Sequence, residues 1–171
     1  MIDLASRIRD VPDFPQRGIL FKDITTLLKD GPAFKSAIDQ ITAQVSGWNV
    51  DLVVGMESRG FIFAAPIAYN LAVGFAPVRK LGKLPSETIS AEYALEYGTN
   101  TLELHTDAIS EGQRVLVVDD LLATGGTVGA TIDLVERLGG EVVGTAFLVE
   151  LTFLEGRRRL DGYRVTTLVS F

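Results

Sequence analysis

The chain has 171 residues, a formal net charge of −6 and no cysteine, and 47% of its residues are hydrophobic. This length suits a single α/β domain, and the lack of cysteine excludes a disulfide framework and thiol chemistry. The negative charge disfavours generic nucleic-acid binding, which depends on neutralising phosphates. The sequence contains no apolar run long enough to span a bilayer and no signal-peptide pattern, so we expect a cytoplasmic protein without a membrane partner.

The N-terminal residues predict a small structure apart from the main sheet. Residues 3–9 have the spacing of a short helix, which Pro12 and Pro15 must end, because each proline restrains its predecessor away from helix. Residues 19–24 then form an extended or looped segment that carries Phe21. Judged alone, an aromatic residue in such a segment is typical of a core position.

A helix–strand–helix pattern follows. Residues 31–46 predict a helix with one apolar face, and 51–56 predict a buried strand. The loop 57–60 precedes an apolar helix over 61–71. Arg59 therefore lies after a strand and close to a helix start, a position suited to anion binding, although pairing with a nearby acid is the alternative.

Residues 73–78 predict a third strand, and a basic segment follows it. Arg79, Lys80 and Lys83 place three positive charges within five residues of an otherwise acidic chain. Such a run is usually a solvated surface, but its position at a strand end favours an anionic ligand. Residues 86–104 then predict two strands, and Glu96 between them, judged alone, is a loop carboxylate. His105, the single histidine, ends this pattern and is expected to have a structural or surface role.

The segment from Val115 to Thr127 carries the strongest chemical pattern. Aliphatic residues predict a strand buried on both faces, and two adjacent carboxylates follow at its end. The small residues after them leave backbone N–H groups free to turn around an anion at a helix N-terminus. This predicted phosphate-binding loop consists of Ala123, Thr124, Gly125, Gly126 and Thr127.

The carboxylates of Asp119 and Asp120 limit what this loop can bind. They would repel a phosphate unless a cation or hydrogen-bond donors intervened. Vicinal sugar hydroxyls or a hydrated divalent cation would serve, and a ribose 5-phosphate fits both halves of the motif. The motif also lies at the position where α/β sheets bind ligands.

The C-terminal part continues the alternation. Residues 141–149 predict a strand, 153–160 a short helix with Arg157 to Arg159 in solvent, and 163–171 a last strand. The alternation of strands and helices predicts an α/β fold with a doubly wound, mostly parallel sheet flanked by helices.

The stretch Val-Val-Asp-Asp-Leu-Leu-Ala-Thr-Gly-Gly-Thr at 117–127 resembles the phosphoribosyl-pyrophosphate (PRPP) motif of the type I phosphoribosyltransferases, in the version of their adenine branch. Three further matches point to that branch. They are Pro-x-x-Gly-x-x-Phe-Lys-Asp-Ile at 15–24, Arg-Lys-x-Gly-Lys-Leu-Pro at 79–85 and Tyr-x-Leu-Glu-Tyr-Gly at 93–98. The resemblance implies transfer of phosphoribose from PRPP to adenine, giving AMP and pyrophosphate in purine salvage.

The resemblance also implies the domain organisation and partners. It implies one domain over residues 1–171, with an N-terminal hood over about 1–30 and a flexible flap over about 80–103. It further implies a homodimer, and Mg²⁺ bound through PRPP and water with no direct protein ligands. The loop after the strand 51–56 commonly includes a non-proline cis peptide in this family.

Individual roles follow from the same resemblance. Glu96 is implied as the general acid/base at the purine, and Tyr97 as a residue that holds the closed flap. Asp119 and Asp120 contact the ribose, and residues 123–127 bind the 5-phosphate. The implied pyrophosphate-binding residues are Ser58, Arg59, Gly60, Arg79, Lys80 and Lys83, and the adenine-binding residues are Leu20, Phe21 and Lys22.

Three alternatives stay open at this stage. A phosphoribosyltransferase for 6-oxo purines or orotate would read its base with a lysine side chain or have a different flap. A PRPP-sensing regulator would carry a DNA-binding domain or a basic face. A relative of PRPP synthase would be much longer than this chain.

Overall fold

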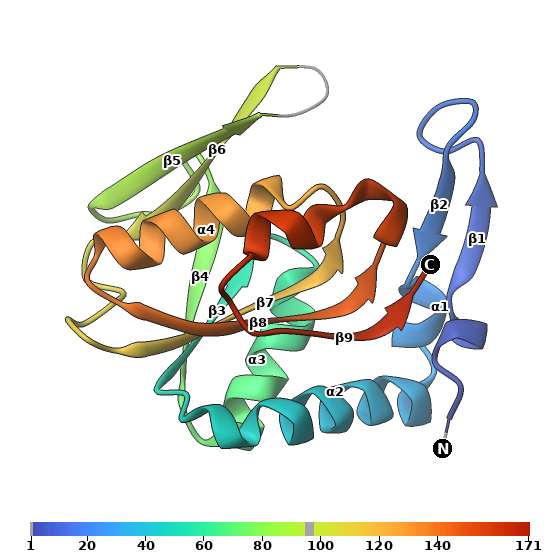
Figure 1. Cartoon of the computed structure of the whole chain (residues 1–171), viewed down its shortest axis with the longest axis horizontal. Helices are drawn as coiled ribbons and strands as arrows, with labels where there is room; N and C mark the ends of the chain where they lie inside the picture. The colour runs from blue at the N-terminus through green and yellow to red at the C-terminus, as the bar shows by residue number, and fades with distance from the viewer. Residues whose placement is uncertain (1, 95–97) are drawn as a thin grey trace.

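The computed structural model describes residues 2–94 and 98–171, and it is built around a seven-stranded sheet (Figure 1). The strand order is β5-β6-β4-β3-β7-β8-β9. The five parallel neighbours are β4 (Gly74–Lys80), β3 (Leu52–Met56), β7 (Arg114–Leu122), β8 (Glu141–Glu150) and β9 (Val165–Ser170). The strands β6 (Thr99–His105) and β5 (Thr88–Ala94) continue the sheet in antiparallel fashion.

Helices cover both faces of this sheet, as the predicted fold class requires. The helices α2 (Gly31–Val45) and α3 (Gly60–Leu71) lie on one face, and α4 (Gly126–Arg137) lies on the other (Figure 1). Alternate residues of the central strands therefore enter different cores: Val53 packs with α2 and α3, whereas Val54 packs with α4. The doubly wound, mostly parallel α/β fold is confirmed, and its strand order reverses between β3 and β7.

Local sequence explains where the helices begin. The Asp30 carboxylate accepts a hydrogen bond from the Ala33 N–H at 3.1 Å, which caps α2, and Pro32 occupies its first turn. Pro66 lies inside α3, and Ala72 ends that helix with a positive φ of 55°. Gly125 precedes α4 with φ of 82°, which glycine adopts without steric cost.

The N-terminal segment differs from its prediction. The expected helix over 3–9 is only a 3₁₀ turn, η1 (Ala5–Arg7), and the chain then enters a hairpin of β1 (Arg9–Pro12) and β2 (Leu20–Asp23). Pairing with β2 explains the difference, because the local helical spacing is outweighed by a ladder that sequence alone does not reveal. A one-turn helix, α1 (Thr25–Leu28), follows the hairpin, and η2 (Ser46–Trp48) extends α2.

The predicted helix over 153–160 also differs. It consists of two 3₁₀ turns, η3 (Thr152–Leu154) and η4 (Gly156–Leu160), separated by Glu155 with φ of 54°. The expectation that Arg157 to Arg159 lie in solvent is confirmed, because all three are exposed. Arg157 also donates two hydrogen bonds to the buried Glu150 carboxylate, at 3.0 and 2.5 Å. The buried Glu150 carboxylate is thus paired with Arg157, and Arg158 pairs with Glu155 at the surface.

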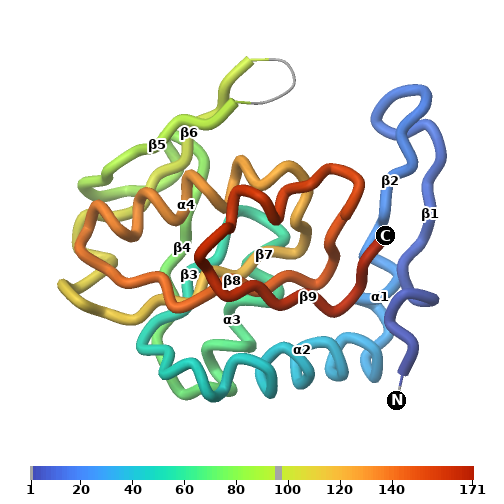
Figure 2. The backbone as a smooth tube through the Cα atoms, viewed as in Figure 1, coloured from blue at the N-terminus to red at the C-terminus, as the bar shows by residue number. Residues whose placement is uncertain are grey.

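The two hairpins lie on either side of the central strand ends. In the backbone view, the carboxyl end of β7 lies between the β5–β6 hairpin and the β1–β2 hairpin (Figure 2). Among the described helices, none is long and apolar enough to cross a membrane.

Candidate active site

A cavity of about 360 Å³ opens at the carboxyl ends of β3, β4 and β7. This volume lies within the range of about 300–1,000 Å³ that small-molecule sites occupy. The position agrees with the point where the strand order reverses, which is where open α/β sheets bind ligands. The cavity is lined by Glu57, Ser58, Arg59, Lys80, Tyr93, Leu102, Asp119, Asp120, Leu121, Ala123 and Thr127.

The two adjacent carboxylates lie at the floor of this cavity. Asp119 and Asp120 lie near the carboxyl end of β7, followed by its last two residues, and the Asp120 N–H donates to Asp119 Oδ1 at 2.9 Å. Asp120 is buried, and its Oδ2 lies 2.7 Å from Arg59 Nε. One carboxylate of the pair is thus matched by a cation, whereas the other has a like charge as its neighbour.

This arrangement makes Asp119 electrostatically unusual. Burial, and then the negative charge of Asp120, raise the pKa of the Asp119 carboxyl well above its usual value. Groups that donate hydrogen bonds or bring positive charge would favour its ionised form. Sugar hydroxyls are such donors, so the pair is suited to bind a ribose.

The loop before α3 approaches Asp119 very closely. A Cβ atom added to Gly60 would lie 2.7 Å from Asp119 Oδ1 and 3.2 Å from the Val118 carbonyl oxygen. Glycine therefore permits the contact between the start of α3 and the end of β7. The peptide bond between Glu57 and Ser58 in this loop is cis.

The predicted phosphate-binding loop follows the carboxylates. It encloses a hollow of about 50 Å³ between Leu121 and Val128, more than the roughly 10–15 Å³ that one water molecule needs. The N-terminus of the twelve-residue helix α4 faces the loop with its unpaired N–H groups. Behind the loop, a Cβ on Gly156 would lie 2.1 Å from the Ala123 carbonyl oxygen, so η4 fixes the back of the loop by close packing.

Of the three basic residues 79, 80 and 83, Lys80 alone lines this cavity. The Arg79 guanidinium pairs with Glu57 at 3.2 Å and also donates to the Lys83 carbonyl oxygen at 3.2 Å. The Lys80 backbone N–H, and then the Arg79 guanidinium, lower the pKa of the Glu57 carboxyl. The predicted anion-binding residues therefore differ in geometry: Lys80 and Arg59 line the cavity, whereas Arg79 lies outside its lining and pairs with Glu57.

The predicted base-binding residues lie on β2, outside the cavity lining. Phe21 is half-buried, its ring packs against Phe14 with centroids 5.2 Å apart, and the Arg59 guanidinium carbon lies 5.7 Å from its ring centre. Arg59 therefore lies between Phe21 and Asp120. Leu20 is exposed, and Lys22 contacts Asp10 at 2.6 Å and the Phe171 ring at 3.8 Å.

Sequence reasoning missed four residues that line the cavity: Glu57, Tyr93, Leu102 and Leu121. Tyr93 begins the Tyr-x-Leu-Glu-Tyr-Gly match, and its ring lies against the loop, 3.2 Å from where a Cβ on Gly126 would be. Glu57 directly follows a buried strand, and that position was the available signal for it. Two predicted residues, Glu96 and Tyr97, lie outside the described residues. His105 ends β6, and its Nδ1 lies 3.3 Å from the Glu87 carbonyl oxygen.

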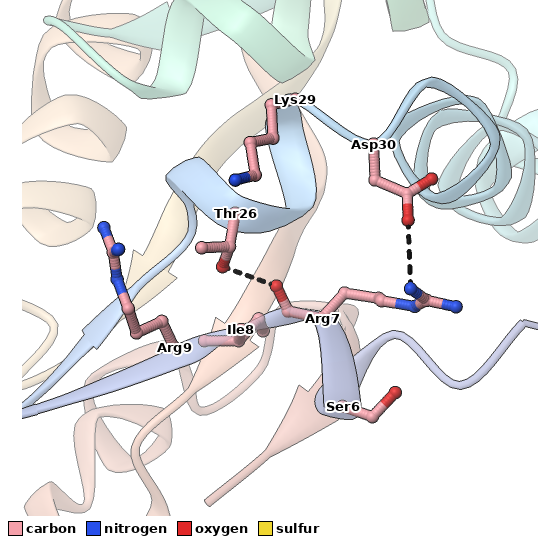
Figure 3. A pocket seen from close by; sticks show the side chains of 7 residues that line it. All are labelled: Ser6, Arg7, Ile8, Arg9, Thr26, Lys29 and Asp30. Atoms are coloured by element: carbon pink, nitrogen blue, oxygen red, sulfur yellow. Dashed lines mark hydrogen bonds and ion pairs between the residues drawn. The ribbon is translucent and has the colours of Figure 1, made fainter.

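A second hollow, of about 510 Å³, lies between η1, β1 and α1 (Figure 3). Both arginines that line it are paired with acids: Arg7 with Asp30 at 3.2 Å, and Arg9 with Asp23. The Thr26 hydroxyl donates to the Arg7 carbonyl oxygen at 2.6 Å. Figure 3 shows Arg7 and Arg9 pointing in opposite directions, so the charges of these two arginines do not converge on the hollow.

Known proteins match this chain over most of its length. The family model described as phosphoribosyl transferase domain matches residues 25–169. An adenine phosphoribosyltransferase of Alkaliphilus metalliredigens is 59% identical over 170 residues, covering 99% of this chain and 100% of the relative.

The chain belongs to the adenine phosphoribosyltransferase family.

Solved structures of this family agree with the fold. The crystal structure of the enzyme from Thermoanaerobacter pseudethanolicus has a TM-score of 0.96 at 57% identity, covering 99% of this chain and 98% of that one. The enzyme of Saccharomyces cerevisiae has a TM-score of 0.90 at 40% identity, with 96% of each chain covered. That structure is a complex with an imino-altritol bisphosphate and adenine.

Proposed function

We propose that this protein is an adenine phosphoribosyltransferase, a pentosyltransferase that moves the 5-phosphoribosyl group of PRPP to adenine and releases pyrophosphate, forming AMP in purine salvage. One observation carries the proposal: a single cavity brings the acid pair Asp119 and Asp120 together with Arg59, Lys80 and the anion-binding loop. The 59% identity to a relative named adenine phosphoribosyltransferase supports the choice of base.

We assign the sugar and its phosphate to the end of β7. Residues 123–127 anchor the 5-phosphate with backbone N–H groups, the hydroxyls of Thr124 and Thr127, and the positive end of α4. This contact is remote from the reacting carbon and fixes its position. Asp119 and Asp120 accept hydrogen bonds from the ribose hydroxyls, and their charge favours the positive character that the C1 carbon gains as pyrophosphate leaves.

We assign pyrophosphate to the loops after β3 and β4. Ser58, Arg59 and Gly60 offer a helix start and a guanidinium, and Lys80 and Lys83 add charge, with Arg79 beside them. In the described part of the chain, no three acidic, histidine or cysteine side chains gather that could hold a metal ion. We propose that Mg²⁺ would be held through PRPP and water beside the acid pair, where it would supply Lewis-acid stabilisation of the leaving group.

We assign adenine to the hood. Phe21 stacks on the purine, and backbone groups of Leu20 and Lys22 read its edge, where an amino donor lies next to an acceptor nitrogen. A 6-oxo purine would present the opposite polarity, and an unmatched buried polar group costs about 1–3 kcal/mol. Glu96 transfers the purine proton and Tyr97 holds the closed flap, which excludes water from the activated sugar. The residues around 80–103 form that flap, and 1–30 form the hood of a single domain.

We also propose a homodimer that works in the cytoplasm, without nucleic-acid or membrane partners. Ile62 and Tyr69, seven positions apart on α3, are 37% and 85% exposed, and Leu81 beside the basic segment is 62% exposed. Large exposed apolar side chains are typical of surfaces that a partner covers. A second copy that covered Leu81 would lie beside Lys80, which we assign to pyrophosphate.

The proposed function is tested by assaying the purified protein with PRPP and Mg²⁺ against adenine, hypoxanthine, guanine and orotate in parallel. We expect pyrophosphate release with adenine alone. Turnover of a 6-oxo base would keep the PRPP site and overturn the base-site assignment. Binding of PRPP without turnover of any base would identify a PRPP-sensing regulator.

The stacking role of Phe21 is tested by Phe21→Leu. Base–aromatic stacking contributes about 1–3 kcal/mol, so we expect the KM for adenine to rise by roughly 5- to 150-fold while the KM for PRPP stays within about twofold. Phe153→Leu, at a 69% exposed residue on η3, is the matched control and should leave both constants unchanged. An unchanged KM for adenine in Phe21→Leu would remove Phe21 from the base site.

A further inference from the structure

The η4 turn forms the back wall of the anion-binding loop, residues 123–127. A Cβ atom on Gly156, the first residue of η4, would lie 2.1 Å from the Ala123 carbonyl oxygen and 3.0 Å from the Gly125 nitrogen. From the other side, a Cβ atom on Gly125 would lie 2.8 Å from the Gly156 carbonyl oxygen. Figure 1 shows this turn, in red, beside α4. The backbones of η4 and the loop are in direct contact, so a displacement of η4 would displace the loop.

An ion pair with the sheet fixes the position of η4. Glu150, the last residue of β8, is only 6% exposed, and its two carboxylate oxygens accept hydrogen bonds from Arg157 Nε at 3.0 Å and Arg157 Nη2 at 2.5 Å. Arg157 directly follows Gly156. The Thr167 hydroxyl, on β9, donates to Glu150 Oε2 at 3.3 Å. Because a bidentate arginine–carboxylate pair fixes orientation as well as distance, η4 is held to β8 and β9 in one geometry.

The same acid lies beside the start of the loop. In the ladder of β7 and β8, Glu150 stands opposite Leu122, the last residue of β7. The Leu151 N–H donates to the Leu122 carbonyl oxygen at 3.0 Å, and Leu122 directly precedes the loop. The loop therefore has two supports, the end of β8 at its start and Gly156 behind it, and Glu150 belongs to the first and holds the second.

Stability alone is a weak explanation for this ion pair. Hydrogen bonds from Arg157 lower the pKa of the Glu150 carboxyl, although its burial acts in the opposite direction. Replacing both partners of a buried ion pair is often nearly neutral for stability, whereas removing one partner leaves an uncompensated charge. The neighbouring pair of Arg158 with Glu155, at 2.7 Å, is exposed and does not reach the sheet. The position of the buried pair, between the sheet and the back of the loop, indicates a role in geometry.

We propose that Glu150 and Arg157 are positioning residues for the 5-phosphate: they hold Gly156 against the back of the anion-binding loop and so fix the directions of its N–H groups. The inference rests on the proposed function and refines it, because it gives the 5-phosphate site a support from outside the loop. A displacement of about 1 Å at a positioning group can cost about 100-fold in rate, so a support of this kind has a measurable value.

Titration with ribose 5-phosphate tests the role of the pair. We expect Arg157→Gln to raise the Kd for ribose 5-phosphate about tenfold and to leave the Kd for pyrophosphate with Mg²⁺ and the KM for adenine within about twofold, because we assign those ligands to other segments. Arg158→Gln is the matched control, since it breaks the exposed pair in the same turn, and it should leave all three constants unchanged. An unchanged Kd for ribose 5-phosphate in Arg157→Gln, or an equal loss of affinity for ribose 5-phosphate and pyrophosphate, would overturn the inference.

Two further variants separate geometry from stability. The double variant Glu150→Gln, Arg157→Gln removes both charges, so its Tm should lie closer to that of the wild type than the Tm of Arg157→Gln does, while the Kd for ribose 5-phosphate stays raised. Gly156→Ala leaves both charges in place but forces η4 away from Ala123, and it should raise the same Kd about tenfold. Its control is Gly47→Ala, because a Cβ atom there meets nothing within 4 Å. Wild-type affinity for ribose 5-phosphate in the double variant or in Gly156→Ala would overturn the inference.

The two levels of proposal fail in different ways. A wild-type protein that does not turn over adenine would reject the proposed function, while the titrations with ribose 5-phosphate would still decide whether the pair supports the loop. Normal turnover in the wild type together with an unchanged Kd for ribose 5-phosphate in Arg157→Gln would overturn this inference and leave the proposed function in place.

Discussion

The carboxylates at the two ends of the paired strands β3 and β7 have opposite pKa shifts. At the amino end, Asp51 accepts three hydrogen bonds from Arg114: the backbone N–H at 3.0 Å, Nε at 2.9 Å and Nη2 at 2.8 Å. The side-chain hydrogen bonds from Arg114 have the largest effect and the backbone bond the next largest, and they lower the pKa of Asp51 to about 2. At the carboxyl end, burial and Asp120 raise the pKa of Asp119.

This contrast indicates that the two ends of the sheet have different roles, one in stability and one in chemistry. At the amino end, Arg114 pairs with Asp51, and this pair stabilises the folded state. The carboxyl end places the half-buried Asp119 next to the buried Asp120 and supplies one guanidinium, from Arg59, for both. Strongly perturbed acids in a cleft are typical of functional sites, where a ligand supplies the missing partners.

The largest effect should come from removing the acids at the carboxyl end. We expect the Asp119→Asn, Asp120→Asn double variant to lose on the order of 100-fold or more in kcat/KM, because the ribose hydroxyls and the cationic sugar lose their charged acceptors. Asp119→Asn alone should keep or raise the Tm near pH 7, because it removes a carboxyl group whose ionised form is disfavoured in the folded state. Steady-state kinetics and thermal unfolding check both results.

The matched change at the other end is Asp51→Asn. It should lower the Tm slightly and leave kcat/KM within about twofold, since Asp51 lies at the opposite end of the strands from the cavity. Full activity in the double variant, or a large activity loss in Asp51→Asn, would contradict the separation of roles.

The carboxyl end was also the more predictable of the two from sequence. Asp119, Asp120 and residues 123–127 are contiguous, and a strand, an acid pair and a glycine turn into a helix each have a local signal. The pairing of Glu57 with Arg79 depends on how β3 and β4 align, 22 positions apart, and no local pattern encodes it. The ladder of β1 with β2 escaped prediction for the same reason, since partners from separate segments decide it.

An intermediate effect is expected from closing the space between α3 and β7. Gly60→Ala would place a methyl group 2.7 Å from Asp119 Oδ1, so the carboxylate must move. We expect kcat/KM to fall about tenfold, because small displacements of a positioning group are costly. Gly129→Ala is the control: a Cβ there meets nothing within 4 Å, so it should keep activity and stabilise the helix by roughly 0.5–1 kcal/mol. Equal activities of the two variants would mean that the close approach of Gly60 has no catalytic value.

The smallest effect concerns how each end responds to acid. The folded-state pKa of Asp51, about 2, lies below its usual value of 3.8, so its contribution to stability is present above about pH 4 and is lost as the pH falls toward 2. The effect of pH on stability has the opposite sign for Asp119: its pKa is raised, so protonation favours the folded state and stability falls as the pH rises through its folded pKa.

Thermal unfolding of the wild type, Asp51→Asn and Asp119→Asn between pH 2 and 7 separates the contributions of the two acids. The Tm advantage of the wild type over Asp51→Asn should be about 1–3 °C at neutral pH and vanish near pH 2, because an exposed pair contributes little. Asp119→Asn should gain on the wild type as the pH rises. If both differences had the same sign across this range, the two ends of the sheet would not hold their carboxylates in opposite ways.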